Sequence, residues 1–272
     1  MSRFITYIAL AEATAVTTVQ LVDRYRDLFG DQIFKIDITA GAGGSDDSIV
    51  LRLDKNLVAV MFIPLPLPQD AYEQALRLDQ FGLWPEAREI MGSHKAHYTV
   101  AVIGSPDDAE GNLNAARMVT LVAGALVDLL PTTVALVFTE ARTITRPTRF
   151  ASFAKNVAAM RAPSSLWTSM AFFRGQPAPN GKNTIGVMSV GLLPFIGREM
   201  EFTPAPVALK ELAERAFATA EYLILKGSVI KDGDTFGMSA DEKIRVRYRD
   251  AGTRPGIPII EMSIDRLDSS ND

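Results

Sequence analysis

The 272-residue chain contains no cysteine, and histidine is almost missing as well, since His94 and His97 are the only two. Without cysteine there can be no disulfide, thiolate zinc site or cysteine nucleophile, which fits a cytoplasmic protein. The chain also lacks a Gly-x-Ser-x-Gly nucleophile elbow and a Gly-x-Gly-x-x-Gly dinucleotide loop. Neither a serine hydrolase nor a Rossmann-type dinucleotide-binding protein is therefore supported.

A large excess of one charge is lacking too. The 28 basic and 32 acidic residues leave a net charge of -4. A chain with this balance produces no field that would draw it to nucleic acid, whereas a basic protein partner would be weakly attracted. We therefore expect a protein partner, and neither nucleic acid nor membrane.

The N-terminus contains a short apolar run, from Phe4 to Leu10, that precedes Ala11-Glu12-Ala13. This order imitates a secretory signal peptide with its cleavage site. However, Thr6 and Tyr7 interrupt a run that is already of minimal length, and the same residues alternate as in a strand. We expect a first strand here.

The most apolar part of the chain lies between residues 94 and 138. The pattern predicts a strand over Tyr98–Ile103, a helix that is capped by Asn112 and runs to about Leu130, and a strand over 133–138. Apolar residues surround the helix, so it belongs inside a domain. The helix is long enough to cross a bilayer, but Arg117 and Asp128 would each cost about 2.5–3.5 kcal/mol near the membrane centre.

Apolar spacing elsewhere predicts helices over residues 15–29, 70–81, 84–91, 150–160 and 206–225. It predicts strands over residues 3–10, 33–38, 49–53, 57–63, 167–173, 184–190, 199–202, 243–248 and 257–264. This mixture predicts an α+β fold, in which a mixed or mainly antiparallel sheet is packed by long helices. We expect one compact unit over residues 1–272. The alternative is two related α/β halves over 1–145 and 163–267 that share one sheet.

A glycine-rich segment, Gly41 to Ser45, superficially resembles a phosphate-binding loop. No lysine followed by serine or threonine comes after it, and the next predicted element is a strand instead of a helix. We therefore expect a hairpin loop.

His94 and His97 are the most obvious candidates for chemistry. On a strand, a spacing of three places the two side chains on opposite faces, so that they cannot bind one metal ion, whereas on a helical turn they could. The following Tyr98–Ile103 segment favours the strand. We favour a structural role, in which one histidine is hydrogen-bonded near a sheet edge.

Glu199 and Glu201 have the opposite geometry, because a spacing of two places both carboxylates on one face of a strand. Paired carboxylates can share a proton or a divalent ion. The same pattern is also that of an ordinary strand with one face in solvent, and we favour this second interpretation.

Asp232 and Asp234 lie in a segment, Lys231 to Gly237, whose Asp and Gly residues are typical of a turn. The segment begins like a calcium-binding loop. The position eleven residues beyond Asp232 is Lys243, however, where such a loop needs a bidentate glutamate. We expect a turn in which the aspartates accept hydrogen bonds from backbone N–H groups.

An ordered set of motifs resembles an uncharacterised bacterial family, a domain of unknown function whose members occur beside polymorphic toxins. The motifs are Trp84-Pro85, His94 to His97, Pro163 to Trp167, Gly197 to Glu201, and Asp232 to Gly237 with the following Ser239 to Lys243. Within this group the chain resembles type VI secretion immunity proteins. The resemblance implies cytoplasmic binding and neutralisation of a secreted toxin, with a nuclease as the expected target. It transfers no catalytic residues.

We therefore expect a non-enzymatic immunity protein without cofactor, metal or catalytic residues. An acidic patch on such a protein could imitate phosphates and steer it to a basic nuclease. The partner-binding candidates are His94, His97, Glu199, Glu201, Asp232 and Asp234. One alternative is a divalent-metal-dependent hydrolase that uses a histidine with these carboxylates, which would have to converge in space. Another is an adaptor that loads secretion cargo.

Overall fold

The structure is a computed structural model that describes residues 4–38, 48–78, 84–104, 108–237 and 242–266. The chain divides into two compact units, Met1–Trp167 and Thr168–Asp272. Each unit has its own sheet with helices packed on it, so the predicted α+β fold class is confirmed, but no sheet is shared. The predicted loop at residues 41–45 lies outside the described residues.

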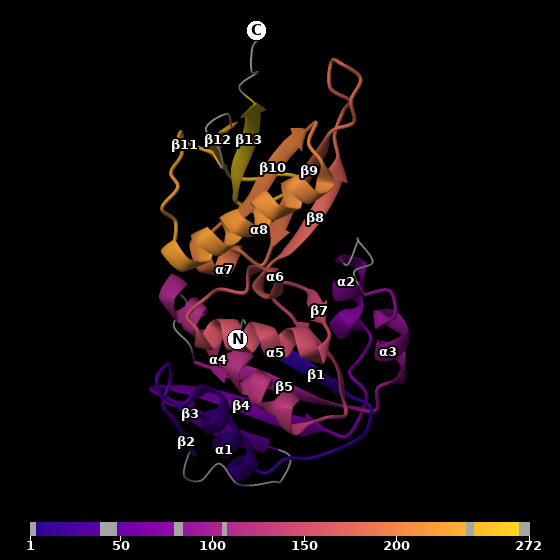
Figure 1. Cartoon of the computed structure of the whole chain (residues 1–272), viewed down its shortest axis with the longest axis vertical. Coiled ribbons are helices and arrows are strands. Elements are labelled where there is room, and N and C mark those ends of the chain that lie inside the picture. Colours follow the sequence, from indigo (N-terminus) through magenta and orange to yellow (C-terminus); the bar gives the residue numbers. More distant parts are fainter. Residues whose placement is uncertain (1–3, 39–47, 79–83, 105–107, 238–241, 267–272) are drawn as a thin grey trace. The chain divides into compact units, whose positions relative to one another are not determined.

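The first unit contains a seven-stranded sheet and six helices among its described residues (Figure 1). Its strands are β1 (Ile5–Leu10), β2 (Ile36–Ile38), β3 (Ser48–Leu53), β4 (Asn56–Ile63), β5 (Ala96–Ile103), β6 (Thr133–Phe138) and β7 (Thr143–Thr145). Its helices are α1 (Thr18–Phe29), α2 (Asp70–Leu78), α3 (Ala87–Ser93), α4 (Ala109–Leu129), α5 (Pro147–Ala158) and α6 (Ser164–Trp167). The short β7 and α6 were not predicted, because the segments that form them carry too few residues to show a period.

The strand order in this sheet is β2-β3-β4-β5-β1-β6-β7, and every neighbouring pair is antiparallel. The N-terminal strand β1 therefore lies between β5 and β6, which α4 connects. This arrangement confirms the strand predicted over residues 3–10, which the structure has at Ile5–Leu10. It also confirms a β-helix-β unit around α4, with the first strand of the chain inserted at its centre.

Helix α4 is buried on nearly every side, as its composition predicts. All residues from Met118 to Leu126 are buried, and α1, α5, β1 and β5 pack around the helix. Its start was predicted wrongly, because the helix begins at Ala109 and its N-cap is Asp108 instead of Asn112. The Asp108 carboxylate accepts a hydrogen bond of 2.7 Å from the Gly111 N–H. This cap offsets the weak helix propensity of a glycine in the first turn.

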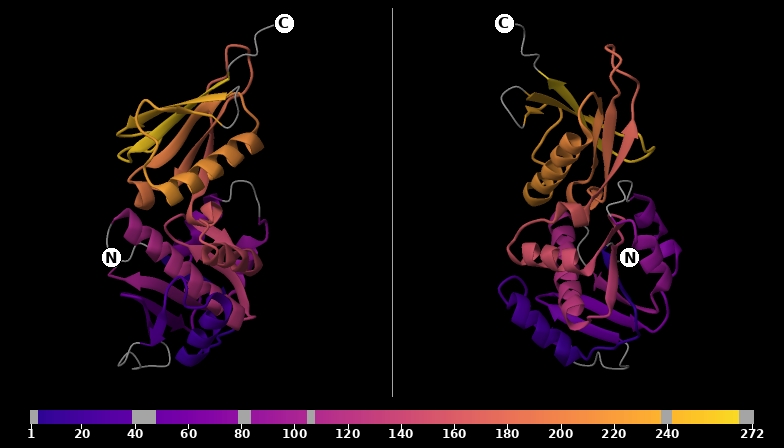
Figure 2. Two further views of the ribbon diagram at one scale, coloured as in Figure 1. Left: turned by 60° about the vertical axis from the view of Figure 1, so that its left-hand side comes forward. Right: turned by 45° about the vertical axis from the view of Figure 1, so that its right-hand side comes forward.

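The two faces of the sheet are covered differently. Helices α1, α4 and α5 lie on one face, where Val58, Val60, Val100 and Val102 are buried. Helices α2 and α3 pack on the other face, against β6 and β7 and around Ala9 of β1 (Figure 2). Part of the second face, over β3, β4 and β5, is therefore not covered by these two helices.

Both histidines hold the proline-rich segment that follows β4. His94, the C-cap of α3, accepts a hydrogen bond of 2.6 Å at Nε2 from the Leu67 N–H, so its Nδ1 donates to the Met91 carbonyl. His97 lies in β5, and its Nδ1 is 2.8 Å from the Leu65 carbonyl oxygen. Both are buried. They have the structural role that we favoured, although β5 is inside the sheet and not at its edge.

The second unit contains a six-stranded sheet in the order β11-β12-β13-β10-β9-β8. Only β10 and β13 pair in parallel. The strands are β8 (Ser169–Arg174), β9 (Ile185–Val190), β10 (Glu199–Ala205), β11 (Thr235–Phe236), β12 (Glu242–Arg249) and β13 (Ile259–Arg266). The described helices are α7 (Leu193–Ile196) and α8 (Leu209–Lys226).

Helix α8 lies across one face of this sheet (Figure 2). Its residues Leu212, Ala216, Ala220 and Leu223 are buried. On β10, β12 and β13, the buried apolar side chains Met200, Phe202, Ile244, Val246, Ile260 and Met262 all stand at even-numbered positions. The odd-numbered positions of β10, β12 and β13 point to the opposite face.

None of the helices in the described part of the chain combines the length and the apolar character needed to cross a membrane. The long apolar helix α4 instead forms the core of the first unit.

Replacement of Gly124 by alanine tests the close packing of α4. A Cβ atom at this position would lie 2.6 Å from the Ala154 Cβ and 3.3 Å from the Phe29 Cζ. Overpacking costs about 1–3 kcal/mol, and the better helix propensity of alanine returns up to about 1 kcal/mol. We expect Gly124→Ala to lower the free energy of unfolding by roughly 1–2 kcal/mol in chemical denaturation. Gly92→Ala in α3, where no atom lies within 4 Å, is the control and should not destabilise.

The burial of His97 predicts a loss of stability in acid. Desolvation lowers the pKa of His97 below its ordinary value of 6.5, although its hydrogen bond to Leu65 opposes this shift. The unfolded chain therefore takes up a proton at a higher pH than the folded chain. Stability is complete above pH 6.5 and falls as the pH drops from there through the folded-state pKa. His97→Asn keeps an N–H donor but cannot titrate, so its melting temperature should fall less than that of the wild type between about pH 7.5 and 5. Equal losses would contradict this role.

Candidate functional site

Glu199 is buried at the start of β10, with 4% of its surface exposed. Its carboxylate accepts hydrogen bonds from the Ser189 hydroxyl at 2.5 Å and from the N–H groups of Gly191, Leu192 and Leu193 at 2.9, 3.1 and 3.2 Å. Burial raises the pKa of this carboxyl, and the four hydrogen bonds oppose the rise. The prediction that Glu199 faces solvent is therefore wrong. Its carboxylate holds the turn between β9 and α7.

Glu201 is buried as well, with 8% exposed, so the same correction applies. Its two oxygens accept hydrogen bonds from the Thr253 N–H at 2.8 Å and the Thr253 hydroxyl at 2.9 Å. Gly252 approaches the carboxylate so closely that a side chain at this position would collide with it. Glu201 therefore fixes the loop between β12 and β13. An alternating strand pattern cannot reveal such partners, because they come from loops distant in sequence.

Asp232 and Asp234 accept hydrogen bonds from backbone N–H groups, as the turn signature predicts. Asp232 Oδ1 is 2.7 Å from the Tyr248 nitrogen, and Asp234 Oδ2 is 2.7 Å from the Lys231 nitrogen. Backbone hydrogen bonds between Gly233, Asp234 and Val246 join the same turn to β12. Both aspartates are exposed. Their hydrogen bonds shape the segment that lies along the outer edge of β12.

The metal-dependent hydrolase alternative needs histidine and carboxylate side chains that converge. Across the described ranges, no group of three or more His, Asp or Glu side chains is arranged to hold a metal ion. The Glu199 and Glu201 carboxylates and the two histidines each have the structural partners given above. The described part of the chain therefore offers no ligand set for this alternative.

The part of the seven-stranded sheet that α2 and α3 do not cover carries an apolar surface that is partly exposed among the described residues. Its side chains alternate with the buried valines of β4 and β5 and stand side by side in the strand register. Met61 and Ile103 are exposed to 42% and 49%. We call this surface the apolar face; it consists of Val50, Leu57, Ala59, Met61, Ala101 and Ile103. Met61 and Ile103 are the exposed members, and the other four are half-buried. A contiguous apolar surface with exposed members is typical of a protein interaction site.

The second unit presents a basic surface on the sheet face opposite α8. Arg245, Arg247 and Arg249 alternate along β12 with the buried Ile244 and Val246, so that all three point to this face. We call them the arginine row. Lys243 continues the row at its beginning and is also exposed. The three arginines line a hollow of about 350 Å³ beside the Asp232 turn.

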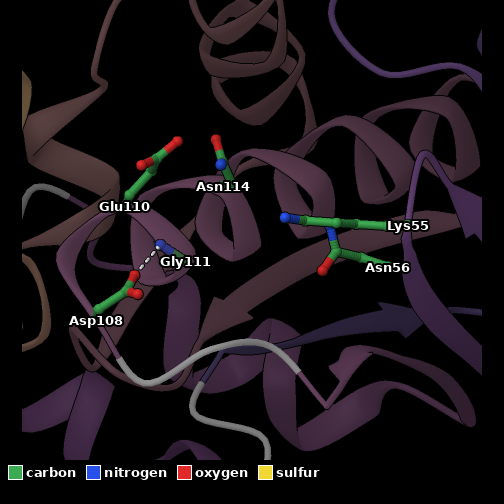
Figure 3. Close-up of a pocket in the computed structure, with 6 residues that line it drawn as sticks. All are labelled: Lys55, Asn56, Asp108, Glu110, Gly111 and Asn114. Carbon is green, nitrogen blue, oxygen red and sulfur yellow. Dashed lines mark hydrogen bonds between the residues drawn. The ribbon is translucent and has the colours of Figure 1, made fainter.

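A smaller pocket of about 120 Å³ lies at the N-terminus of α4 (Figure 3). Lys55 points toward it from one side, while Asp108, Glu110 and Asn114 line the side formed by the start of α4. The Asp108 carboxylate is already bonded to the Gly111 N–H. With one lysine and two carboxylates, the lining selects neither an anion nor a cation, so we assign no ligand to this pocket.

Neither exposed surface was predicted, although each has a signal in the sequence. The arginine row appears as the strict alternation of basic and apolar residues in residues 243–249. The apolar face appears as the nearly continuous apolar run in residues 57–63, where alternation would be expected if one side faced water. Such a run is normally interpreted as a strand that is buried on both sides.

Replacement of Glu199 by alanine tests its structural role. The change would leave three backbone N–H groups and the Ser189 hydroxyl without their buried acceptor. We expect a loss of about 3 kcal/mol or more, seen as a drop of more than about 10 °C in the melting temperature of the second unit. Glu214→Ala on the exposed side of α8 is the control and should leave the melting temperature unchanged. An unchanged melting temperature for Glu199→Ala would refute the anchoring role.

Residues 188–261, from β9 into β13, match the model of a domain of unknown function (DUF4261). The match therefore lies wholly in the second unit and includes Glu199, Glu201, the Asp232 turn and the arginine row. No curated protein and no solved structure matches the chain.

Proposed function

We propose that the chain is an immunity protein that binds a cognate secreted toxin, of the type VI secretion kind, and neutralises it in a stoichiometric complex. The observation that carries the proposal is the apolar face. A protein partner that covers this face would remove its exposed side chains from water, which stabilises a complex by about 25 cal/mol per Å². The motif resemblance described above supports a toxin as that partner.

The apolar face suits a protein partner better than a small ligand. It is spread over three neighbouring strands, β3, β4 and β5. Small-molecule sites are concave and enclose their ligand, whereas protein interfaces are broad and have an apolar centre. Arg52, which is exposed in β3 next to Leu57, provides a polar border.

The class of toxin is left open in this proposal. The resemblance implies a nuclease target, which an acidic patch that imitates phosphates could bind. Glu199 and Glu201 were candidates for such a patch, but they are buried and bonded to Ser189 and Thr253. Inhibition by binding requires only that the complex block the toxin or hold it in an inactive state.

The first experiment is co-purification of this chain with the product of the neighbouring gene, followed by a toxicity or activity assay with increasing amounts of the chain. We expect a stable complex whose activity reaches zero near an equimolar ratio. A complex that remains fully active would favour the cargo-adaptor alternative instead. The lack of any complex would refute the immunity proposal.

The variant Ile103→Asp tests whether the apolar face is the contact surface. A charge at this exposed position should weaken toxin binding at least about tenfold, because its burial in an interface would require desolvation. Val19→Asp is the matched control, since Val19 is exposed to 58% on α1 and is not part of the apolar face. Binding should be measured by calorimetry after circular dichroism has shown that both variants are folded. Equal affinity for both variants would exclude this face as the interface.

A further inference from the structure

We propose that the arginine row binds an acidic, extended segment of the toxin, with the Arg247 guanidinium as the main carboxylate-binding group. This inference rests on the proposed function and adds the chemistry of the partner. It concerns a surface in the second unit that is independent of the apolar face.

The ion pairs among the described side chains of this sheet leave the Arg247 guanidinium without a carboxylate partner. Arg245 pairs with Asp265, and the Arg249 Nη2 lies 3.2 Å from a Glu261 oxygen. In the strand register, Glu261 is opposite Arg247, yet it is bonded to Arg249 instead. Among the described side chains, Arg247 therefore has no ion-pair partner. Its exposed guanidinium can form a bidentate pair with an incoming carboxylate.

Arg245 and Arg249, which stand on either side of Arg247 in the arginine row, also belong to the site. Arg245 and Arg249 are each paired with a carboxylate, Asp265 and Glu261, which restricts these flanking side chains before a partner arrives. Preorganised side chains lose less conformational entropy on binding. Lys243, which is exposed at the start of the same row, adds a second available cation.

The spacing of the available cations fits an extended segment. Alternate residues of a strand are about 6.7 Å apart, so Lys243 and Arg247 are separated by about 13 Å. Carboxylates four residues apart in an extended peptide have the same separation. The hollow of about 350 Å³ beside Arg247 gives such a segment a place along β12.

The charges around the row favour a peptide over nucleic acid. Nucleic acid binding needs several unpaired cations along a regular phosphate backbone. Here two of the three arginines are already paired with carboxylates, and Asp232 lies at the border of the hollow. The whole chain has a net charge of -4. An acidic peptide needs to place only one or two carboxylates at defined positions.

The test measures the affinity of the full chain for the toxin by calorimetry at low and at high salt. Arg247→Glu and Arg247→Gln are compared with Arg174→Glu, which reverses an exposed charge in β8 at the opposite edge of the same sheet. We expect Arg247→Glu to weaken binding about tenfold or more, Arg247→Gln to weaken it less, and Arg174→Glu to leave it unchanged. The affinity of the wild type should also decrease with salt more steeply than that of Arg247→Gln.

Unchanged affinity of both Arg247 variants for a toxin that the wild type binds would overturn this inference and leave the proposed function intact. Failure of the wild type to bind the toxin would overturn both. A mobility-shift assay with a DNA and an RNA oligonucleotide completes the test. Oligonucleotide binding by the wild type that is lost in Arg247→Glu would also overturn the inference, because the row would then recognise phosphates.

Discussion

The burial of α4 against the seven-stranded sheet is the constraint on which the first unit depends. A helix with apolar residues on nearly all sides needs neighbours on all sides, and α1, α5, β1 and β5 provide them. Gly124 allows Phe29 and Ala154 to approach the helix closely. Helices α1, α4 and α5 occupy one face of the sheet, and α2 and α3 pack on the other face. These two helices lie near β6 and β7, so the apolar face over β3, β4 and β5 remains exposed.

The second unit depends on a different interaction, the burial of two carboxylates at the start of β10. Glu199 holds the turn before α7, and Glu201 holds the loop between β12 and β13. Buried charges are costly unless hydrogen bonds satisfy them, and here backbone and hydroxyl donors do so. Together they fix the connections on both sides of the parallel β10–β13 pair, next to the strand that carries the arginine row.

The two exposed surfaces have complementary physical roles in the proposed complex. An apolar surface provides affinity through the removal of water, while charged groups mainly provide specificity and speed of association. The arginine row and the Glu199 anchor both lie in the segment that matches the domain of unknown function, whereas the apolar face lies outside it. The matched domain therefore carries the specificity element of our proposal, and the first unit carries the apolar contact.

Much of the fold could be predicted from the sequence alone, because helix and strand formation depends on local periodicity. The burial of α4, the strand character of β1 and β5, and the Asp232 turn all follow from residues close together in the chain. The sequence could not show which donors surround Glu199, since Ser189 and Leu193 reach it only through the turn between β9 and α7. It also could not show that Met61 and Ile103 are exposed, because an apolar run has the same pattern whether a helix covers it or not. Whether a strand is covered, and which charge pairs with which, depends on contacts between distant segments, so only the tertiary structure decided these features.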